Sequence, residues 1–190
     1  NYLMREIEPI KEFLGNFIER AIFGDSKAFA SHAKLFFDFK IDYDDIDDVY
    51  EMQEVLMEIL IKKIAIWSEN ENSSKVFGAF DFLAALFDCK FAKVLDLDEI
   101  FEILLRENSK FLLNFFEIFG PILEVLHFDI LEFYLETVEV HLKMDWKFVE
   151  VLQEILELRE NRWKKKKNEN EKIEKFFENL NNENFRSKLV

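Results

Sequence analysis

Apolar side chains recur along most of this chain at the spacing of an α-helix. Between Trp146 and Leu158 they occupy every third or fourth position, at Phe148, Val151, Leu152, Ile155 and Leu156. Such a stripe is typical of an amphipathic helix that buries one side. Two earlier runs repeat the spacing, at Val49, Met52, Leu56, Ile59 and Leu60 and at Val76, Phe80, Leu83 and Phe87. The pattern predicts an all-α fold.

Short polar residues mark where these helices start, because an Asp or Ser oxygen accepts hydrogen bonds from the free N–H groups of a first turn. They precede most of the apolar runs, at Asp25 or Ser26, Asp45, Ser74, Asp96, Ser109 and Asp145. We therefore expect helices near residues 4–21, 26–39, 47–67, 75–88, 97–107, 109–119, 122–142, 146–160 and 169–180. The pattern does not decide whether the helix at 122–142 is broken near His127 and Asp129.

The connections between these helices are short, so sequence neighbours should pack antiparallel. Lys110–Phe119 reads KFLLNFFEIF, and a helix that is apolar over so much of its surface is covered on two sides. With roughly 40 residues per helix pair, this favours antiparallel helix pairs stacked as a HEAT-like solenoid. We expect residues 1–163 to form its body, with most of the 23 Phe residues in the core. Residues 164–190 are expected to form a basic linker and a C-terminal helix that completes or flanks the last pair.

Composition narrows the class of protein. Four Gly and two Pro in 190 residues are too few for the turns of a β-sandwich or barrel, and no two Gly are close enough for a phosphate loop. The single cysteine, Cys89, excludes an internal disulfide and a thiolate zinc site and fits a reducing, cytoplasmic location. The longest apolar stretch, residues 76–87, is too short to span a bilayer, so no membrane partner is expected. Because the chain opens at Asn1 with no signal sequence, we expect an excised fragment.

The net charge of −14 is unevenly distributed. Residues 161–190 carry nine basic and five acidic residues, which leaves 16 of the 25 basic and 34 of the 39 acidic residues in 1–160. An acidic body suits a basic partner and repels nucleic acid. The run Lys164, Lys165, Lys166 and Lys167 is the one place suited to a phosphate backbone, as in mRNA. A solvated linker explains the same run equally well.

One acidic segment, residues 42–48, offers candidate metal ligands. Asp44, Asp45 and Asp48 match the DDxxD pattern that holds magnesium and diphosphate in all-helical prenyl-chain enzymes. That chemistry needs a second acidic motif and basic residues for the diphosphate, and neither is evident. A calcium loop starting at Asp42 fails because Asp47 stands where Gly is required. A loop that caps the following helix, either as a partner surface or simply solvated, is the better interpretation.

No catalytic constellation emerges elsewhere. Glu124 and His127 form half of a carboxylate-bridged di-iron motif, but the chain has no second E-x-x-H. His32 and His141 have no patterned partner, and Cys89 has no fixed His or Asn companion. We therefore expect a protein that is not an enzyme, with no cofactor and no metal.

The end of the last apolar run resembles a known block. Residues 152–163, LQEILELRENRW, look like the last block of the middle domain of translation initiation factor 4G, which reads approximately (F/Y)-M-L-Q-D-V-(I/L)-D-L-R-x-N-x-W before a basic stretch. Identical positions are Leu152, Gln153, Leu158, Arg159, Asn161 and Trp163, and similar ones are Glu154, Ile155, Leu156 and Glu157. Residues 78–88, GAFDFLAALFD, are similar to that family's G-N-x-x-F-I-G-E-L-F-K helix through Gly78, Phe82, Leu86 and Phe87.

The resemblance implies a crescent of HEAT-like helix pairs, its first repeat mostly missing here. It also implies a translation initiation scaffold that binds the DEAD-box RNA helicase, initiation factor 4A, and holds its two lobes half open. Our candidate partner-binding residues are Asp42, Asp44, Asp45, Asp47 and Asp48, together with Arg159, Asn161, Arg162 and Trp163. For Arg159 and Trp163 a purely structural role stays open. Related adaptors of nonsense-mediated decay, nuclear cap binding and splicing are the alternative, as are an RNA-binding solenoid and a magnesium-dependent enzyme.

Overall fold

The computed structural model describes residues 3–41, 46–107, 109–142 and 148–164. Within these ranges the chain is all-α, as predicted, with eight α-helices, one short 3-10 turn and no strand. The α-helices are α1 (Leu3–Phe23), α2 (Ser26–Ile41), α3 (Ile46–Glu69), α4 (Ser73–Asp88), α5 (Val94–Glu107), α6 (Leu112–Leu126), α7 (Phe128–Leu142) and α8 (Phe148–Glu160), and the 3-10 turn η1 (Ser109–Phe111) precedes α6. The helix expected at 169–180 lies outside the described residues.

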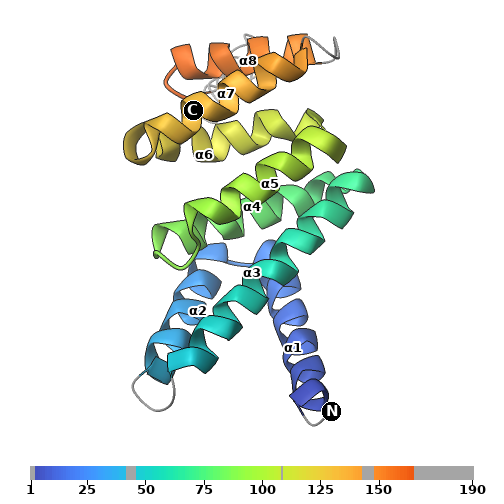
Figure 1. Cartoon of the computed structure of the whole chain (residues 1–190), viewed down its shortest axis with the longest axis vertical. Helices are drawn as coiled ribbons and strands as arrows, with labels where there is room; N and C mark the ends of the chain where they lie inside the picture. Colours follow the sequence, from blue (N-terminus) through green and yellow to red (C-terminus); the bar gives the residue numbers. More distant parts are fainter. Residues whose placement is uncertain (1–2, 42–45, 108, 143–147, 165–190) are drawn as a thin grey trace, which may run out of the picture.

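The helices stack along the long axis of the molecule, with α1 to α3 at one end, α4 and α5 in the middle, and α6 to α8 at the other end (Figure 1). α4 packs against α1, α2 and α3 on one side and against α6 on the other. α6 in turn contacts α5, α7 and α8. The two central helices therefore join the ends of the molecule. Within the described part of the chain, no helix combines the length and the apolar character needed to cross a membrane.

Side-chain caps explain several helix starts. Asp25 or Ser26 was predicted to cap α2, and it is the Asp25 carboxylate that accepts from the backbone N–H groups of Lys27 and Ala28, both at 3.1 Å. The cap predicted at Ser74 was wrong, because Asn72 accepts the Lys75 N–H instead. α5 begins at Val94, three residues earlier than expected: Asp96 sits inside its first turn and accepts from the N–H of Lys93 at 2.6 Å. Acceptors placed this way satisfy N–H groups that have no partner within the helix.

Three helices end on a residue with left-handed backbone that is not glycine. Glu71, Lys90 and Arg162 have φ values of 53°, 62° and 56°. In each case the next N–H donates to a carbonyl five residues back, from Asn72 to Trp67, from Phe91 to Leu86 and from Trp163 to Leu158. This is the Schellman arrangement, in which glycine is the usual residue because other side chains crowd the backbone at positive φ.

The boundary between α6 and α7 corrects one prediction. The sequence suggested a break between 119 and 122, but α6 continues through Gly120 and Pro121 to Leu126. The break falls at His127, as one of the open possibilities allowed, where the backbone turns to φ −147° and the N–H donates to Leu123. Pro121 lacks an N–H and costs the helix a hydrogen bond. Burial of α6 on several sides outweighs that cost.

The core is rich in phenylalanine, with nine buried Phe side chains among the described residues, although five others are exposed, namely Phe13, Phe23, Phe77, Phe128 and Phe133. The fully buried aromatic residues are Phe80, Phe82, Phe101, Phe111, Phe115, Phe116, Phe119 and Tyr134. Rings from α4, α5, α6 and α7 contact one another around Phe115, whereas Phe82 faces Phe17 of α1. Tyr134 stacks on Phe101 with ring centroids 4.1 Å apart, and its hydroxyl donates to Asp98. The apolar α6 segment is covered on more than one side, which confirms the expectation for KFLLNFFEIF.

Candidate functional site

The block that resembles initiation factor 4G joins three helices. Arg159, in the last turn of α8, places its Nε 3.1 Å from Glu124 of α6 and its Nη2 2.6 Å from Glu132 of α7. Its guanidinium also lies 5.4 Å from the centre of the Phe128 ring. The indole N–H of Trp163 donates to the second oxygen of Glu124. One carboxylate thus receives hydrogen bonds from both ends of the matched R-x-N-x-W sequence.

Trp163 closes this end of the molecule over a glycine. Its ring lies directly against Gly120, where an added Cβ would come within 2.6 Å of ring atom Cη2. The side chain is only 8% exposed although its backbone has a φ of 61°. The contact with Gly120, the bond to Glu124 and the N–H bond to Leu158 together hold this conformation.

These contacts set the charge state of Glu124. The hydrogen bond from Trp163, followed by the bond and the charge of Arg159, lowers the pKa of Glu124 despite its partial burial. Glu124 therefore remains a carboxylate, and it is engaged with Trp163 and Arg159. Among the described residues, no group of three or more His, Cys, Asp and Glu side chains is placed to hold a metal ion.

Some of the predicted partner-binding residues make contacts within the molecule, some are exposed, and others lie outside the described residues. Arg159 and Trp163 are committed to contacts within the molecule, as the structural alternative allowed. Asn161 is half-buried, while Arg162 and Lys164 are exposed. Asp42, Asp44, Asp45, Lys165, Lys166 and Lys167 lie outside the described residues, and of Asp47 and Asp48 only the helical backbone of α3 is described. A role for these residues stays a prediction.

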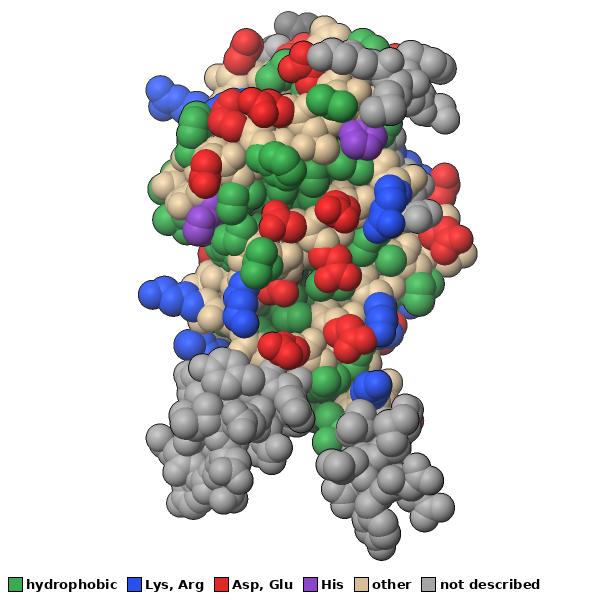
Figure 2. Space-filling view, viewed as in Figure 1, with side chains coloured by type: hydrophobic (Ala, Val, Ile, Leu, Met, Phe, Trp, Pro, Cys, Tyr) green, Lys and Arg blue, Asp and Glu red, His purple; other side chains and the backbone are tan. Residues whose placement is uncertain are grey.

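An acidic groove between α3 and α5 was not predicted from the sequence. Its lining combines the carboxylates of Glu54, Glu58, Asp96 and Glu99 with Gln53, Met57, Ile61 and Lys93. Gln53 donates to the carbonyl of Phe91 and so ties α3 to the start of α5. Figure 2 shows acidic side chains distributed over this face of the molecule. The negative charge was readable in the sequence, but only the packing of α3 on α5 brings the two sets of carboxylates together.

The groove is suited to contacts with cationic side chains. Burial raises the pKa of Asp96 and so disfavours its charge, although the backbone bond and charge of Lys93 partly oppose this shift. The groove also holds the carboxylates of Glu54, Glu58 and Glu99, of which Glu58 pairs with Lys62. The floor of the groove is apolar, since it is formed by Met57 and Ile61, which are both 4% exposed. Carboxylates around such a floor favour a basic surface on a partner.

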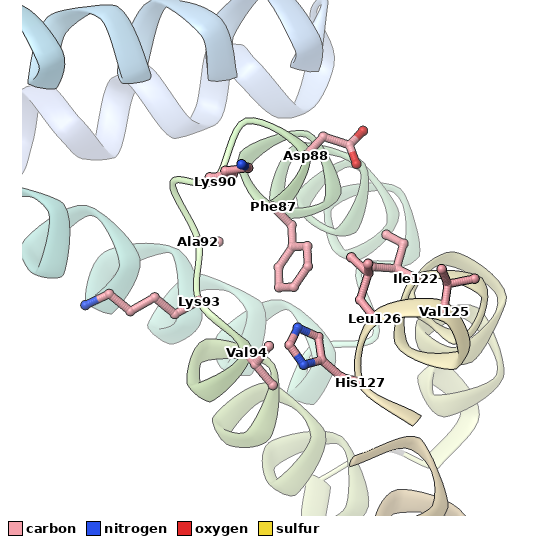
Figure 3. Close-up of a pocket in the computed structure, with 10 residues that line it drawn as sticks. All are labelled: Phe87, Asp88, Lys90, Ala92, Lys93, Val94, Ile122, Val125, Leu126 and His127. Atoms are coloured by element: carbon pink, nitrogen blue, oxygen red, sulfur yellow. The ribbon is translucent and has the colours of Figure 1, made fainter. Parts of the chain in front are cut away.

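A second depression, the apolar hollow, lies where α4 ends, α5 begins and α6 ends (Figure 3). Its volume is about 540 Å³, and its lining residues are Phe87, Asp88, Lys90, Ala92, Lys93, Val94, Ile122, Val125, Leu126 and His127. The Phe87 and His127 rings meet edge to face with centroids 6.4 Å apart. No local pattern in the sequence indicates this hollow, because its lining is drawn from three separate segments.

The Cys89 thiol is half-buried just after the end of α4. Burial raises the pKa of its thiol, and the nearby Lys34 charge only partly offsets this effect. The sulfur lies 3.3 Å from the carbonyl oxygen of Leu86, within reach of a weak hydrogen bond. A protonated thiol is a poor nucleophile, so the group fits packing better than catalysis.

Comparisons of the chain with protein-family models, with curated proteins and with solved structures find no match. The likeness to the initiation factor 4G middle domain therefore rests on the residues of the two sequence blocks. The structure itself defines an all-helical protein with an acidic groove and an apolar hollow.

Proposed function

We propose that this chain is a non-catalytic scaffold of translation initiation, with a HEAT-like solenoid fold, that binds and activates the DEAD-box helicase initiation factor 4A. One observation carries the proposal. The residues shared with the last block of the initiation factor 4G middle domain are joined by a single network, Arg159 and Trp163 on Glu124. A sequence block with so specific a packing role is better explained by a shared fold than by chance spacing.

The stacking of helices supports the HEAT-like part of the proposal. Consecutive helices α6, α7 and α8 contact one another, and α4 contacts both α3 before it and α6 beyond α5. Contacts of this kind between neighbours and next neighbours favour a helical solenoid, although α1 also packs closely on α4, three helices along the chain. A rigid elongated stack can touch two mobile domains at separate points.

Activation needs no chemistry from the scaffold. A helicase whose two lobes exchange between open and closed arrangements shifts toward whichever arrangement gains more contact energy on the scaffold. The acidic groove offers one contact for a basic lobe surface. Exposed Arg162 and Lys164 lead into the lysine run, which would add salt-dependent contacts to mRNA in the cytoplasm.

Calorimetry with the initiation factor 4A of the same organism tests the proposal, with steady-state ATPase rates measured in parallel. We expect micromolar or tighter binding and a raised ATPase rate. No binding by a chain that retains its helical circular dichroism would contradict the proposal. The same assay with the helicases of nonsense-mediated decay and splicing would then test the related adaptor functions.

A further inference from the structure

The outer face of α8, at the end of the stack, carries an apolar stripe that is partly exposed (Figure 1). Val149 is 45% and Leu156 is 43% exposed, and Leu152 between them is half-buried. Their spacing of three and four residues places them on one side of the helix, whereas the buried Ile155 and Leu158 face the rest of the molecule. The terminal helix of a solenoid usually presents a polar outer face. The stripe therefore indicates that a further segment packs on α8.

The chain beyond α8 contains a segment with a matching pattern. Residues 169–180 read ENEKIEKFFENL, and their apolar side chains are Ile173, Phe176, Phe177 and Leu180. This spacing predicts an amphipathic helix with one apolar side. Its remaining positions are all Glu, Lys or Asn, so a helix docked through the apolar side would present a polar surface to water.

The two apolar stripes match when the helices run antiparallel. Steps of four and three residues separate the apolar positions in both, so each stripe is about 10 Å long at the helical rise of about 1.5 Å per residue. The facing pairs are Ile173 with Leu156, Phe177 with Leu152 and Leu180 with Val149. Removal of these side chains from water stabilises the packing.

The connection between α8 and this segment is long enough for the chain to turn back. α8 ends at Glu160, which leaves residues 161–168 as the connection, and packed helices are usually joined by about 2–8 residues. Trp163 is held against Gly120, and the chain from there to residue 169 can span up to about 20 Å. Helices that pack together have axes only about 8–10 Å apart. The segment can therefore reach the outer face of α8.

Acidic side chains lie where this connection would pass. Asp129, Glu132 and Glu136 are spaced to share one face of α7. Glu132 lies 2.6 Å from Nη2 of Arg159, in the last turn of α8, so this acidic face borders the end of α8. The lysines at 164–167 follow shortly after, and their attraction to these carboxylates favours a chain that turns back along α8.

The apolar hollow is a less suitable position for the same segment. Trp163 contacts Gly120 and Glu124 on one side of α6, whereas Val125 and Leu126 of the hollow project from the opposite side. The chain would have to pass around α6 to reach the hollow, while the stripe belongs to the helix that the chain has just left.

We propose that residues 169–180 form a helix that packs antiparallel on the outer face of α8 and closes the end of the helical stack. Tethering gives the segment an effective concentration in the millimolar range, far above that of a separate partner or a second copy of the chain. This packing is a property of the chain by itself and does not depend on helicase binding.

Cysteines introduced into the full chain test this packing, in a Cys89→Ser background that has no other thiol. The matched pairs are Leu156→Cys with Ile173→Cys and Val149→Cys with Leu180→Cys, and the mismatched control is Leu156→Cys with Leu180→Cys. A disulfide needs Cα atoms within about 7 Å, and the mismatched positions are offset by about 10 Å along the helices. With oxidised glutathione, we expect both matched pairs to close within the chain at least about tenfold faster than the mismatched pair, as measured by mass spectrometry.

Three results of this experiment would overturn the proposal. Equal rates for the matched and mismatched pairs would show that the segment has no fixed register on α8. Disulfides formed between chains, at rates that rise with protein concentration, would make a second copy the occupant. A disulfide between Leu126→Cys and Phe177→Cys that forms faster than the matched pairs would place the segment in the apolar hollow. Circular dichroism of each reduced variant checks that its helices are retained.

Hydrogen exchange provides a measurement that needs no cysteine. In the unaltered chain, the amides of residues 171–180 should be protected from exchange, because a packed helix keeps its hydrogen bonds closed. Phe177→Glu should abolish this protection, whereas Asn179→Glu, which adds the same charge on the polar side of the segment, should retain it. Unprotected amides in the unaltered chain, or equal protection in the two variants, would also overturn the proposal.

Discussion

At the scale of single residues, Glu124 stabilises the packing of two helices, whereas Lys90 has a strained backbone conformation at the end of one helix. Glu124 joins α6 to α8 by accepting from Arg159 and Trp163. Lys90 instead holds a strained left-handed backbone so that the Phe91 N–H can reach Leu86. Each case leads to a measurable effect on stability.

Replacing Lys90 by Gly should stabilise the protein by roughly 0.5–1 kcal/mol, because Gly adopts a φ of 62° without crowding its own Cβ. The matched control is Lys11→Gly, inside α1, where the same replacement should destabilise by about 1 kcal/mol. Urea unfolding followed by circular dichroism measures both. Equal destabilisation by the two variants would show that the positive φ at Lys90 carries no strain.

Glu124 makes stability depend on acidity. Its folded pKa is depressed by Trp163 and Arg159, so its contribution is present above the unfolded pKa of about 4.3 and is lost as pH falls through the lower folded value. The variant Glu124→Gln should be less stable than the unaltered chain at pH 7 and approach it below about pH 4. Unfolding free energies measured from pH 7 to pH 3 give this difference.

Glu154→Gln, on the exposed side of the same helix α8 as Arg159, is the control for that comparison. It should follow the pH profile of the unaltered chain. A constant difference between Glu124→Gln and the unaltered chain across the whole pH range would contradict the role given to the Glu124 charge.

At the scale of helices, close approach depends on residues without a side chain. Gly78 of α4 lies against the end of α1, where an added Cβ would overlap the carbonyl oxygen of Ile22 and stand 3.1 Å from its Cβ. Gly120 plays the same part for α6 beneath Trp163. Gly lowers the intrinsic stability of a helix interior, so its presence at both positions is explained by the close contact between helices.

Gly78→Ala should therefore destabilise the protein by about 1–3 kcal/mol, even though Ala is the better helix former. Gly15→Ala in α1 is the control, since its Cβ would meet only the Lys63 side chain, at 3.9 Å. That variant should gain up to about 1 kcal/mol. Thermal or urea unfolding distinguishes the two, and a stabilised Gly78→Ala variant would mean that α1 and α4 are less closely packed than described.

At the scale of the whole molecule, charge and shape are distributed unevenly. The acidic groove lies between α3 and α5, and the apolar hollow lies between α4, α5 and α6, with Lys93 in the lining of both. Surfaces of opposite character on one rigid stack allow different partners to bind at different places. The first of these surfaces belongs to the proposed helicase contact.

Charge reversal tests the assignment of the groove. Glu54→Lys combined with Glu99→Lys should weaken the binding of initiation factor 4A by about tenfold and reduce its dependence on salt, because a basic surface loses its complement. The control pair, Glu12→Lys with Glu136→Lys, changes net charge equally at exposed positions outside the groove. Calorimetry at two salt concentrations measures both pairs. Equal weakening by the two pairs would assign the effect to overall charge and remove the groove from the proposal.

Helical periodicity alone was enough to predict the class of fold and much of the core. Leu56, Leu60, Val76, Phe80 and Leu83 were placed on inward faces, and all are buried, because a helix that buries one side must repeat apolar residues every three or four positions. The positions of the helix ends were harder to predict from the sequence. Asn72 and Asp96 act through geometry that several nearby polar residues could equally have adopted.

The sites depended on tertiary structure. Nothing in the local pattern distinguishes Glu124 as the acceptor for Trp163, which lies 39 residues along the chain, or separates the buried Leu158 from the exposed Leu156. The groove and the hollow are formed by segments distant in sequence, such as Phe87 and Leu126. Helix propensity and amphipathic spacing act within one helix, so both can be recognised from the order of residues alone. Surfaces between helices form only when particular helix faces pack together. Which faces pack depends on the fit of all the side chains together.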